Sequence, residues 1–138
     1  MLKPVLFLLL IFATFSSSFA QQTQKNAISA TVADTSVYTN VDEFPEFPGG
    51  FEGLMQFIKT NLRYPKRAQS KGITGRVILG FVIEKDGTLS RFKIYKGIGY
   101  GCDEEVIRVF KKSPVWKPGT TNGNIVRVQY AVPISFNL

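Results

Sequence analysis

Apolar residues recur from residue 51 onward, first with a helical period and then with a strand period. Between residues 51 and 63 the apolar positions fall at helical spacing, at Phe51, Leu54, Met55, Ile58 and Leu62. Glu52 stands in the first turn of this segment, and Lys59 and Arg63 stand in the last, as the helix dipole favours. The sequence therefore predicts a helix that Tyr64-Pro65 ends.

Residues 77 to 95 alternate in the way that is typical of strands. One face of the first run carries Val77, Leu79, Phe81 and Ile83, and one face of the second carries Phe92 and Ile94. The turn EKDGT lies between the runs, and its Asp86-Gly87 pair is typical of a tight reversal. The pattern predicts an antiparallel hairpin.

A second helix and a long last strand follow. Helical spacing returns at Cys102, Val106, Val109 and Phe110, and it stops at Ser113-Pro114. WKPGTTNGNIV contains the turn dipeptides Pro118-Gly119 and Asn122-Gly123, so it predicts a loop or a short arm. Strict alternation then predicts a half-buried strand with one face formed by Val126, Val128, Tyr130, Val132, Ile134 and Phe136. The predicted order is helix, strand, strand, helix, strand.

The first 43 residues lack these periods. Residues 1–20 combine Lys3, an apolar run, and Ser18 and Ala20 in a small-x-small arrangement, which predicts a secretory signal peptide cleaved after Ala20. An uncleaved membrane anchor is the alternative, although the apolar run of about eleven residues is shorter than the roughly twenty that a span requires. Residues 21–43 are polar and predict a flexible leader, so residues 44–138 form the one folded domain.

Composition argues against an enzyme. The chain has no histidine and one cysteine, which excludes the usual zinc sites, Ser-His-Asp and Cys-His triads, and an internal disulfide. We therefore expect no catalytic residue, no metal and no cofactor. Cys102 at a helix start could be a reactive thiol, but its place on the apolar stripe favours a buried one. Trp116 is expected to close the core, and an exposed ligand anchor is the alternative.

The segment KGIGYGCDEE has the glycine content of a phosphate-binding loop. Its spacing is G-x-G-x-G, a hairpin strand precedes it, and the carboxylates of Asp103, Glu104 and Glu105 would repel a phosphate. The segment therefore predicts a crossover.

The chain has a formal net charge of +7, and GRVILGFVIE is loosely similar to an RNA-binding strand. However, Phe81 shares its face with apolar residues, so we predict a core position and no nucleic-acid partner.

Several motifs in one order resemble the C-terminal domain of the TonB family of energy transducers, in the form found in Bacteroidetes, where FPGG precedes the first helix. The motifs are Tyr64-Pro65 with Arg67-Ala68, Gly72-Ile73 and Gly75, Asp86-Gly87, Trp116-Lys117-Pro118-Gly119, and the alternating last strand. The resemblance covers about residues 44–138. It implies an α+β fold with a three-stranded antiparallel sheet and two helices packed on one face.

The resemblance also implies a partner, the TonB box of outer-membrane TonB-dependent receptors, which adds as a strand to the last strand during nutrient transport. In this sequence the implied receptor-peptide positions are Arg127, Val128, Gln129, Tyr130 and Ala131. Tyr64, Pro65 and Arg67 match the family's Tyr-Pro motif near the receptor contact; a simple helix stop is the other interpretation of Tyr64-Pro65.

Pro133 interrupts the donors of the last strand, because proline has no backbone N–H. Amides of alternate residues point to the same side, so Arg127, Gln129, Ala131 and Pro133 share one direction if the strand is regular. If that direction is the free edge, we expect a docked peptide to pair mainly with residues 127–131 and to lose register beyond Ala131.

The chain departs from a full transducer in its N-terminal part. It has no histidine, its first segment resembles a cleavable signal, and its leader of about 23 residues would span at most about 80 Å. Two functions therefore stay open, both in the periplasm. One is an energy transducer, with an inner-membrane proton-channel complex as a second partner if the N-terminus is uncleaved. The other is a free periplasmic interaction module. Pairing of the domain with itself also stays open.

Overall fold

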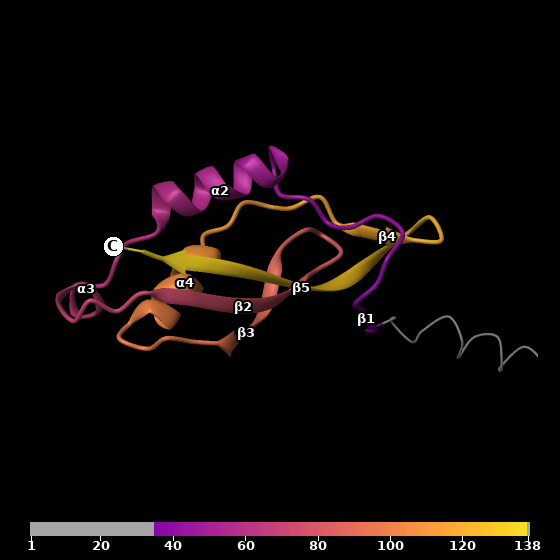
Figure 1. Cartoon of the computed structure of the whole chain (residues 1–138). Helices are drawn as coiled ribbons and strands as arrows, with labels where there is room; N and C mark the ends of the chain where they lie inside the picture. The colour runs from indigo at the N-terminus through magenta and orange to yellow at the C-terminus, as the bar shows by residue number, and fades with distance from the viewer. Residues whose placement is uncertain (1–34, 138) are drawn as a thin grey trace, which may run out of the picture. The chain divides into compact units, whose positions relative to one another are not determined.

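The computed structural model describes residues 35–137, which form an α+β domain (Figure 1). The predicted signal at 1–20 and residues 21–34 of the predicted leader lie outside the described residues. The elements are β1 (Val37–Tyr38), α2 (Gly50–Asn61), α3 (Lys66–Ser70), β2 (Gly75–Ile83), β3 (Leu89–Lys96), α4 (Cys102–Phe110), β4 (Gly119–Thr121) and β5 (Asn124–Phe136). No described helix has the length and apolar character needed to cross a membrane.

The strands follow the order β1-β5-β2-β3, and β4 pairs with the start of β5. β2 is antiparallel to both β3 and β5, whereas β1 is parallel to β5. The predicted antiparallel sheet of three strands is therefore too small, and the predicted order lacks β1, α3 and β4. These three elements have two, five and three residues, so none is long enough to produce a readable period.

Two tight turns connect neighbouring strands. The predicted hairpin of β2 and β3 is confirmed: Gly87 has φ +84°, and Asp86 Oδ1 accepts hydrogen bonds from Thr88 N at 3.0 Å and Thr88 Oγ1 at 2.6 Å. β4 is the short arm expected before the last strand. It joins β5 through Asn122 and Gly123, whose φ values of 50° and 75° suit a two-residue hairpin loop.

One hydrophobic core joins both long helices to the same face of the sheet. The predicted inward residues of β2 are all fully buried, and so are Cys102, Val106 and Val109 of α4; the cluster also includes Leu54, Ile58, Phe110, Trp116, Val132, Ile134 and Phe136. Trp116 is 2% exposed, and its ring packs edge-on against Phe47 at 5.4 Å. The predictions of a core tryptophan and a buried thiol are confirmed.

Helix α2 is rotated relative to the predicted apolar stripe. Leu54 and Ile58 are buried as expected, but Phe51 is 75% exposed and Met55 is 47% exposed. The cause is Phe57, whose ring packs between Phe47 at 5.4 Å and Phe110 at 6.5 Å. This contact turns the face carrying residues 54, 57 and 58 toward the core, so the first two apolar residues of the stripe point outward.

Residues 35–43, which the sequence analysis assigned to the leader, contact the rest of the domain. Val37 and Tyr38 form β1, and Val41 is buried against Val126 and Val128. The backbone N–H groups of residues 42 and 43 donate to Thr120 O at 3.1 and 3.0 Å. A two-residue strand inside a polar segment gave no alternation from which this packing could be predicted.

Candidate functional site

The last strand β5 has neighbours on both sides at its start but on one side only further along. Val128 pairs with Ile83 of β2 and also with Tyr38 of β1, so β1 and β2 lie on opposite sides of β5. β1 extends only over Arg127 and Val128. Among residues 35–137, no strand pairs with Gln129–Phe136 on the side opposite β2, and we call this side the open edge.

The side chain of Gln129 indicates which main-chain groups point to the open edge. Its Nε2 donates to Phe81 O at 3.2 Å and to Tyr130 O at 3.5 Å. Phe81 and Tyr130 are partners across β2 and β5, and one nitrogen reaches both carbonyls only if both point into the space between the two strands. The main chain of Tyr130 therefore faces β2. By alternation, the residues whose main chain faces the open edge are Gln129, Ala131, Pro133 and Ser135.

Pro133 consequently lies with its missing donor on the open edge. It pairs with Ile78 without any register shift between β2 and β5, so the strand is regular at this point. The open edge offers N–H donors at Gln129 and Ala131, and then none until Ser135. This placement agrees with the rule that proline within sheets is found at edges, and it also discourages edge-to-edge pairing.

Arg127 uses its side chain within the domain. Its Nε donates to Glu84 Oε2 at 2.6 Å, and its Nη2 donates to Glu84 Oε1 at 2.9 Å, which is a bidentate ion pair. Its Nη1 donates to Thr35 O at 2.7 Å. Together with a hydrogen bond from Ser90, the Arg127 guanidinium holds the pKa of Glu84 below its usual range. Arg127 thus connects β5, the end of β2 and the residues before β1.

The other predicted edge positions differ in what they present. Val128 is fully buried, and the ring of Tyr130 packs against Trp116 at 5.5 Å on the core side. Gln129 uses its amide between the strands, whereas Ala131 is exposed. Any contact with a partner at these positions would therefore be made mainly by the backbone.

Tyr64 and Pro65 lie in the connection between α2 and α3. α2 ends at Asn61, and Pro65 directly precedes α3, so the pair separates two helices as the helix-stop interpretation requires. The ring of Tyr64 packs edge-on against Phe136 at 5.5 Å, and its hydroxyl donates to the carbonyl oxygen of Ile73. Tyr64 therefore marks the C-terminal end of β5.

The two predicted groups of binding residues lie far apart along β5. Arg67 follows Tyr64 by three residues and is exposed. Its guanidinium lies 5.5 Å from the ring centre of Tyr100. From Val128 to Phe136, which Tyr64 contacts, β5 rises about 26 Å at the usual spacing of strands. The structure therefore does not bring Tyr64, Pro65 and Arg67 together with residues 127–131. An extended segment of about eight residues would be needed to reach both.

The glycine-rich connection before α4 is occupied by a carboxylate of the same chain. Asp103 Oδ1 accepts a hydrogen bond from Ile98 N at 3.0 Å, and its Oδ2 accepts one from Gly99 N at 3.3 Å. The backbone donors that would bind a phosphate are thus used by Asp103. The interpretation of this segment as a crossover is confirmed.

Cys102 is fully buried in the core. Burial raises the pKa of its thiol, and the negative charges of Asp103, Glu104 and Glu105 raise it further. The thiol therefore stays protonated at neutral pH and is a poor nucleophile. Among the residues that the structure describes, no group of three His, Cys, Asp or Glu side chains could hold a metal ion.

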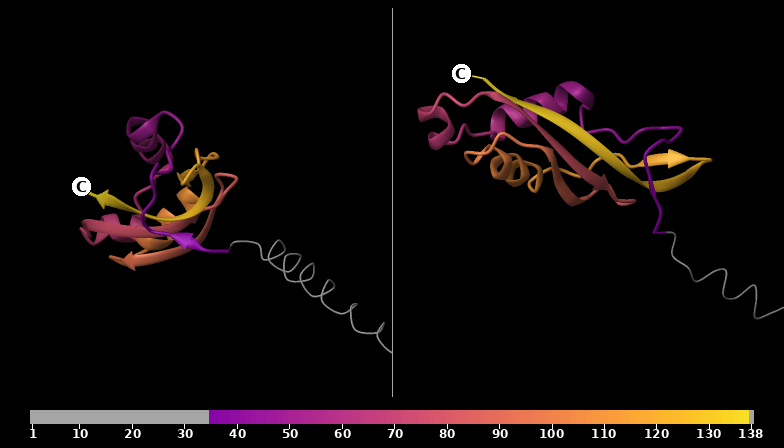
Figure 2. Two further views of the ribbon diagram at one scale, coloured as in Figure 1. Left: turned by 90° about the vertical axis from the view of Figure 1, so that its right-hand side faces the viewer. Right: turned by 60° about the horizontal axis from the view of Figure 1, so that its bottom comes forward.

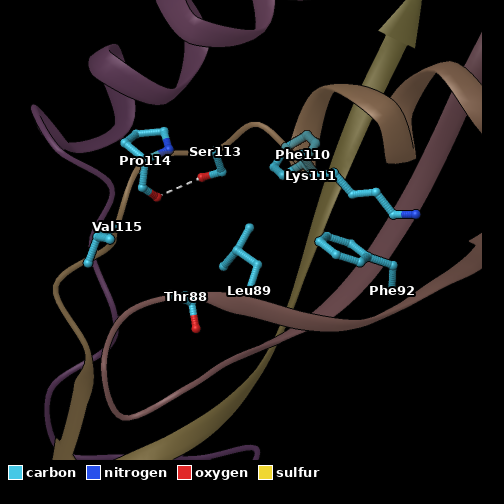
Figure 3. A pocket seen from close by; sticks show the side chains of 8 residues that line it. All are labelled: Thr88, Leu89, Phe92, Phe110, Lys111, Ser113, Pro114 and Val115. Carbon is cyan, nitrogen blue, oxygen red and sulfur yellow. Dashed lines mark hydrogen bonds between the residues drawn. The ribbon is translucent and has the colours of Figure 1, made fainter.

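A hollow of about 260 Å³ lies between the β2–β3 turn and the end of α4 (Figure 3). Its lining residues are Thr88, Leu89, Phe92, Phe110, Lys111, Ser113, Pro114 and Val115. Lys111 is the one titratable side chain in the lining, and Figure 3 shows its amine directed away from the hollow. The lining offers no pair of groups for acid–base catalysis.

The sequence did not reveal that β1 shares the edge with the predicted receptor positions. The only signal was Val37-Tyr38, a β-branched residue followed by an aromatic one in a polar segment. The exposed Phe51 and Met55 were also missed as surface residues, because helical spacing alone cannot fix the rotation of a helix on its core.

The fold and the site together define a small α+β domain whose last strand has one open edge. The chain belongs to the family described as Gram-negative bacterial TonB protein C-terminal, whose family model matches residues 60–138. The family assignment made from the sequence motifs is thus confirmed.

Solved structures that are similar to this chain include two TonB C-terminal domains. One is the TonB C-terminal domain of Helicobacter pylori, with 24% identity, 62% of this chain and 90% of that chain covered, and a TM-score of 0.48. The other is that of Pseudomonas aeruginosa, with 29% identity, 56% and 78% covered, and a TM-score of 0.46. A comparison with curated proteins gave no match.

Proposed function

We propose that this domain binds the TonB box of outer-membrane TonB-dependent receptors by strand addition to the open edge of β5. The protein would then act in the cell envelope as an energy transducer that supports nutrient transport, with no catalytic role. The observation that carries the proposal is the open edge itself, which presents outward donors at Gln129 and Ala131 in a chain of the TonB family. Strand addition requires such a row of unpaired main-chain groups.

Of the proposed positions Arg127, Val128, Gln129, Tyr130 and Ala131, only the odd-numbered three turn their main chain to the open edge. Their main-chain hydrogen bonds would supply most of the affinity, because the five positions together offer little free side-chain surface. We propose that the peptide pairs mainly with residues 127–131 and loses register beyond Ala131. The support for this register is Pro133, which has no N–H on the open edge. Tyr64, Pro65 and Arg67 would contact only a segment long enough to extend to the other end of β5.

Two proline substitutions test the register. Ala131→Pro removes a donor that points to the open edge, without removing a donor to β2, so we expect about tenfold weaker binding of a synthetic TonB-box peptide. Ser135→Pro is the matched control: it removes an outward donor beyond the gap at Pro133, so we expect little change. Calorimetry with the full chain in mild detergent measures both. Equal losses for the two variants would refute the proposed register.

Backbone amide shifts test the site itself. We expect saturable shifts at Gln129 and Ala131 when the labelled full chain is titrated with receptor segments that contain a TonB box. Hydrogen exchange of the complex should show new protection at Ala131 and none at Ser135 or Asn137. The absence of shifts with several receptors from the same cell would refute receptor binding.

A free periplasmic interaction module is the second candidate, and a sequence observation favours it. Residues 1–20 have the features of a cleaved signal, and cleavage would leave the domain without an inner-membrane anchor. The inner-membrane proton-channel complex is a proposed partner only if this segment stays attached. Intact mass from a membrane-free periplasmic extract distinguishes the two, because a mature chain starting at Gln21 supports the free module.

A further inference from the structure

The first described residues of the chain lie where the proposed docking of a receptor peptide begins. β1 runs parallel to β5, with Val37 opposite Arg127 and Tyr38 opposite Val128. Figure 2 shows this short strand, coloured indigo, at the edge of the sheet. Both of its partner positions belong to the proposed docking segment, residues 127–131. A peptide that pairs with the whole segment must therefore replace β1.

The contacts that hold β1 in place include a hydrogen bond from an arginine, strand pairing and an apolar contact. Arg127, which is fixed by its ion pair with Glu84, donates from Nη1 to Thr35 O at 2.7 Å. The two strand pairs with β5 form the second contact. The third is apolar, because Tyr38 packs against the cluster of Val41, Val126 and Val128.

These contacts make β1 the part of the sheet that can leave most easily. β1 has two residues, both half-buried, and Thr35 and Ser36 before it are exposed. By contrast, the pairing of β2 with β5 runs unbroken from Gly75 to Ile83. Segments with few buried contacts and few protected hydrogen bonds open at a small free-energy cost. β1 can therefore detach while the β2–β5 ladder stays intact.

We propose that residues Thr35–Tyr38 act as a built-in competitor for the open edge. With β1 in place, Arg127 and Val128 are closed to an incoming strand; when β1 detaches, they become available. This inference rests on the proposed function. The apparent affinity for a receptor peptide is then the intrinsic affinity multiplied by the fraction of molecules in which β1 is detached.

The contacts of β1 also indicate the chemistry of the peptide that replaces it. An incoming extended peptide would place a backbone carbonyl at the position of Thr35 O, where Arg127 Nη1 can donate to it. It would need an apolar side chain at the position of Tyr38, because detachment of β1 exposes Val126 and Val128. A peptide with a charged residue at that position should compete poorly with β1.

A double proline variant tests the competition. Neighbouring strand residues point their N–H groups to opposite sides, so Val37→Pro with Tyr38→Pro removes the β1 donor to β5 whichever residue supplies it. We expect this variant of the full chain to bind a synthetic TonB-box peptide about tenfold more tightly than the wild type. The matched control, Thr39→Pro with Asn40→Pro, puts two prolines in the exposed bend after β1 and should leave the Kd unchanged.

A second probe tests the edge without any receptor. A synthetic peptide with the sequence of residues 35–42, TSVYTNVD, should bind to the double proline variant and shift the amide of Gln129. It should bind at least about tenfold more weakly to the wild type, whose own β1 occupies the edge. The same peptide with proline at both β1 positions is the control and should not bind.

A disulfide between β1 and β5 tests the state in which β1 cannot detach. Val37→Cys with Arg127→Cys places two thiols on directly opposed residues of β1 and β5, at a spacing that a disulfide can join. We expect the oxidised variant to bind the receptor peptide at least about tenfold more weakly than the same variant after reduction. Both forms lack Arg127, so this comparison isolates the effect of the covalent link to β1. Undiminished binding in the oxidised form would overturn the inference.

The outcomes separate this inference from the proposed function. If the receptor peptide binds to wild type and double proline variant with equal Kd, the competition is refuted and receptor binding stands. If no variant binds the receptor peptide while TSVYTNVD still binds to the double proline variant, the proposed function is refuted and the competition for receptors falls with it. Only tighter receptor binding after loss of β1, with the bend control unchanged, supports the inference.

Discussion

At the scale of single residues, Glu84 connects the end of β2 to Arg127 of β5, and Arg127 in turn contacts Thr35 before β1. Its carboxylate accepts two hydrogen bonds from Arg127 and one from Ser90, so its pKa in the folded protein lies below the ordinary value of 4.5. The ionised form is therefore more stable in the folded chain than in the unfolded one. The contribution is fully present above pH 4.5 and is lost as the pH falls through the lowered folded pKa.

The lowered pKa of Glu84 in the folded chain leads to a prediction about stability and pH. Glu84→Gln should lower the free energy of unfolding at pH 7 by about 1 kcal/mol, because the ion pair is partly exposed. The variant should also lose less stability between pH 5 and pH 3 than the wild type does, because a glutamine cannot be protonated there. Glu105, whose pKa Arg108 lowers, remains as a second source of acid sensitivity. Thermal unfolding across this pH range measures the effect, and parallel curves for both proteins would contradict it.

At the scale of elements, the β2–β3 turn is held against the segment that follows α4. Trp116 N donates to Gly87 O at 2.9 Å, and a Cβ on Gly87 would lie 2.0 Å from Trp116 O. The turn therefore requires glycine at position 87 for two reasons: its φ of +84° and the close approach of the Trp116 backbone. Gly123 has a similar φ of +75° but no atom within 4 Å of such a Cβ.

This pair of glycines gives a matched experiment. Gly123→Ala should cost about 1 kcal/mol, the penalty of a left-handed conformation for a residue with a Cβ. Gly87→Ala should cost at least about 2 kcal/mol more, because backbone atoms must also move apart. Chemical denaturation of both variants measures the difference. Equal losses would mean that the contact with Trp116 O relaxes without cost.

The elements that could be predicted from the sequence are those that cover several periods. β2, β3, α4 and β5 extend over eight or more residues each. The predicted inward residues pack toward the core in each of them, although those of β3 are only half-buried. β1 could not be predicted, because its position depends on pairing with Arg127 and Val128, distant residues that leave no mark on local spacing. The rotation of α2 was missed for a similar reason, since the tertiary contacts of Phe57 decide it.

The sequence predicted which strand forms the candidate site, but it did not predict how much of that strand's edge is free. The family resemblance implied an edge at β5, and alternation with Pro133 predicted a gap in its donors if Arg127, Gln129 and Ala131 face the free side. However, Tyr64 at the far end of β5 and β1 at Arg127 define the length and the occupancy of that edge. Both depend on contacts between segments far apart in the sequence. Local patterns therefore predicted the chemistry of the edge, and the fold determined how much of it is accessible.

At the scale of the whole molecule, charge predicts how a receptor segment would reach the edge. From residue 44 onward the sequence contains 15 Lys and Arg against 7 Asp and Glu. Such a surplus raises the encounter rate with an acidic partner through long-range attraction, which salt screens over about 10 Å at 0.1 M. The proposed hydrogen bonds at the edge are short-range, so salt should change dissociation little.

We therefore expect the association rate of an acidic receptor segment to fall about tenfold between low and high salt, while its dissociation rate changes less than about twofold. Stopped-flow measurements on the full chain provide both rates. A neutral segment with the same TonB box is the control, and its association should depend only weakly on salt.

If detachment of β1 limits association instead, the observed association rate becomes independent of peptide concentration at high concentration, and the double proline variant removes that limit. A salt effect confined to dissociation would instead place the charged contacts inside the bound complex, against this expectation.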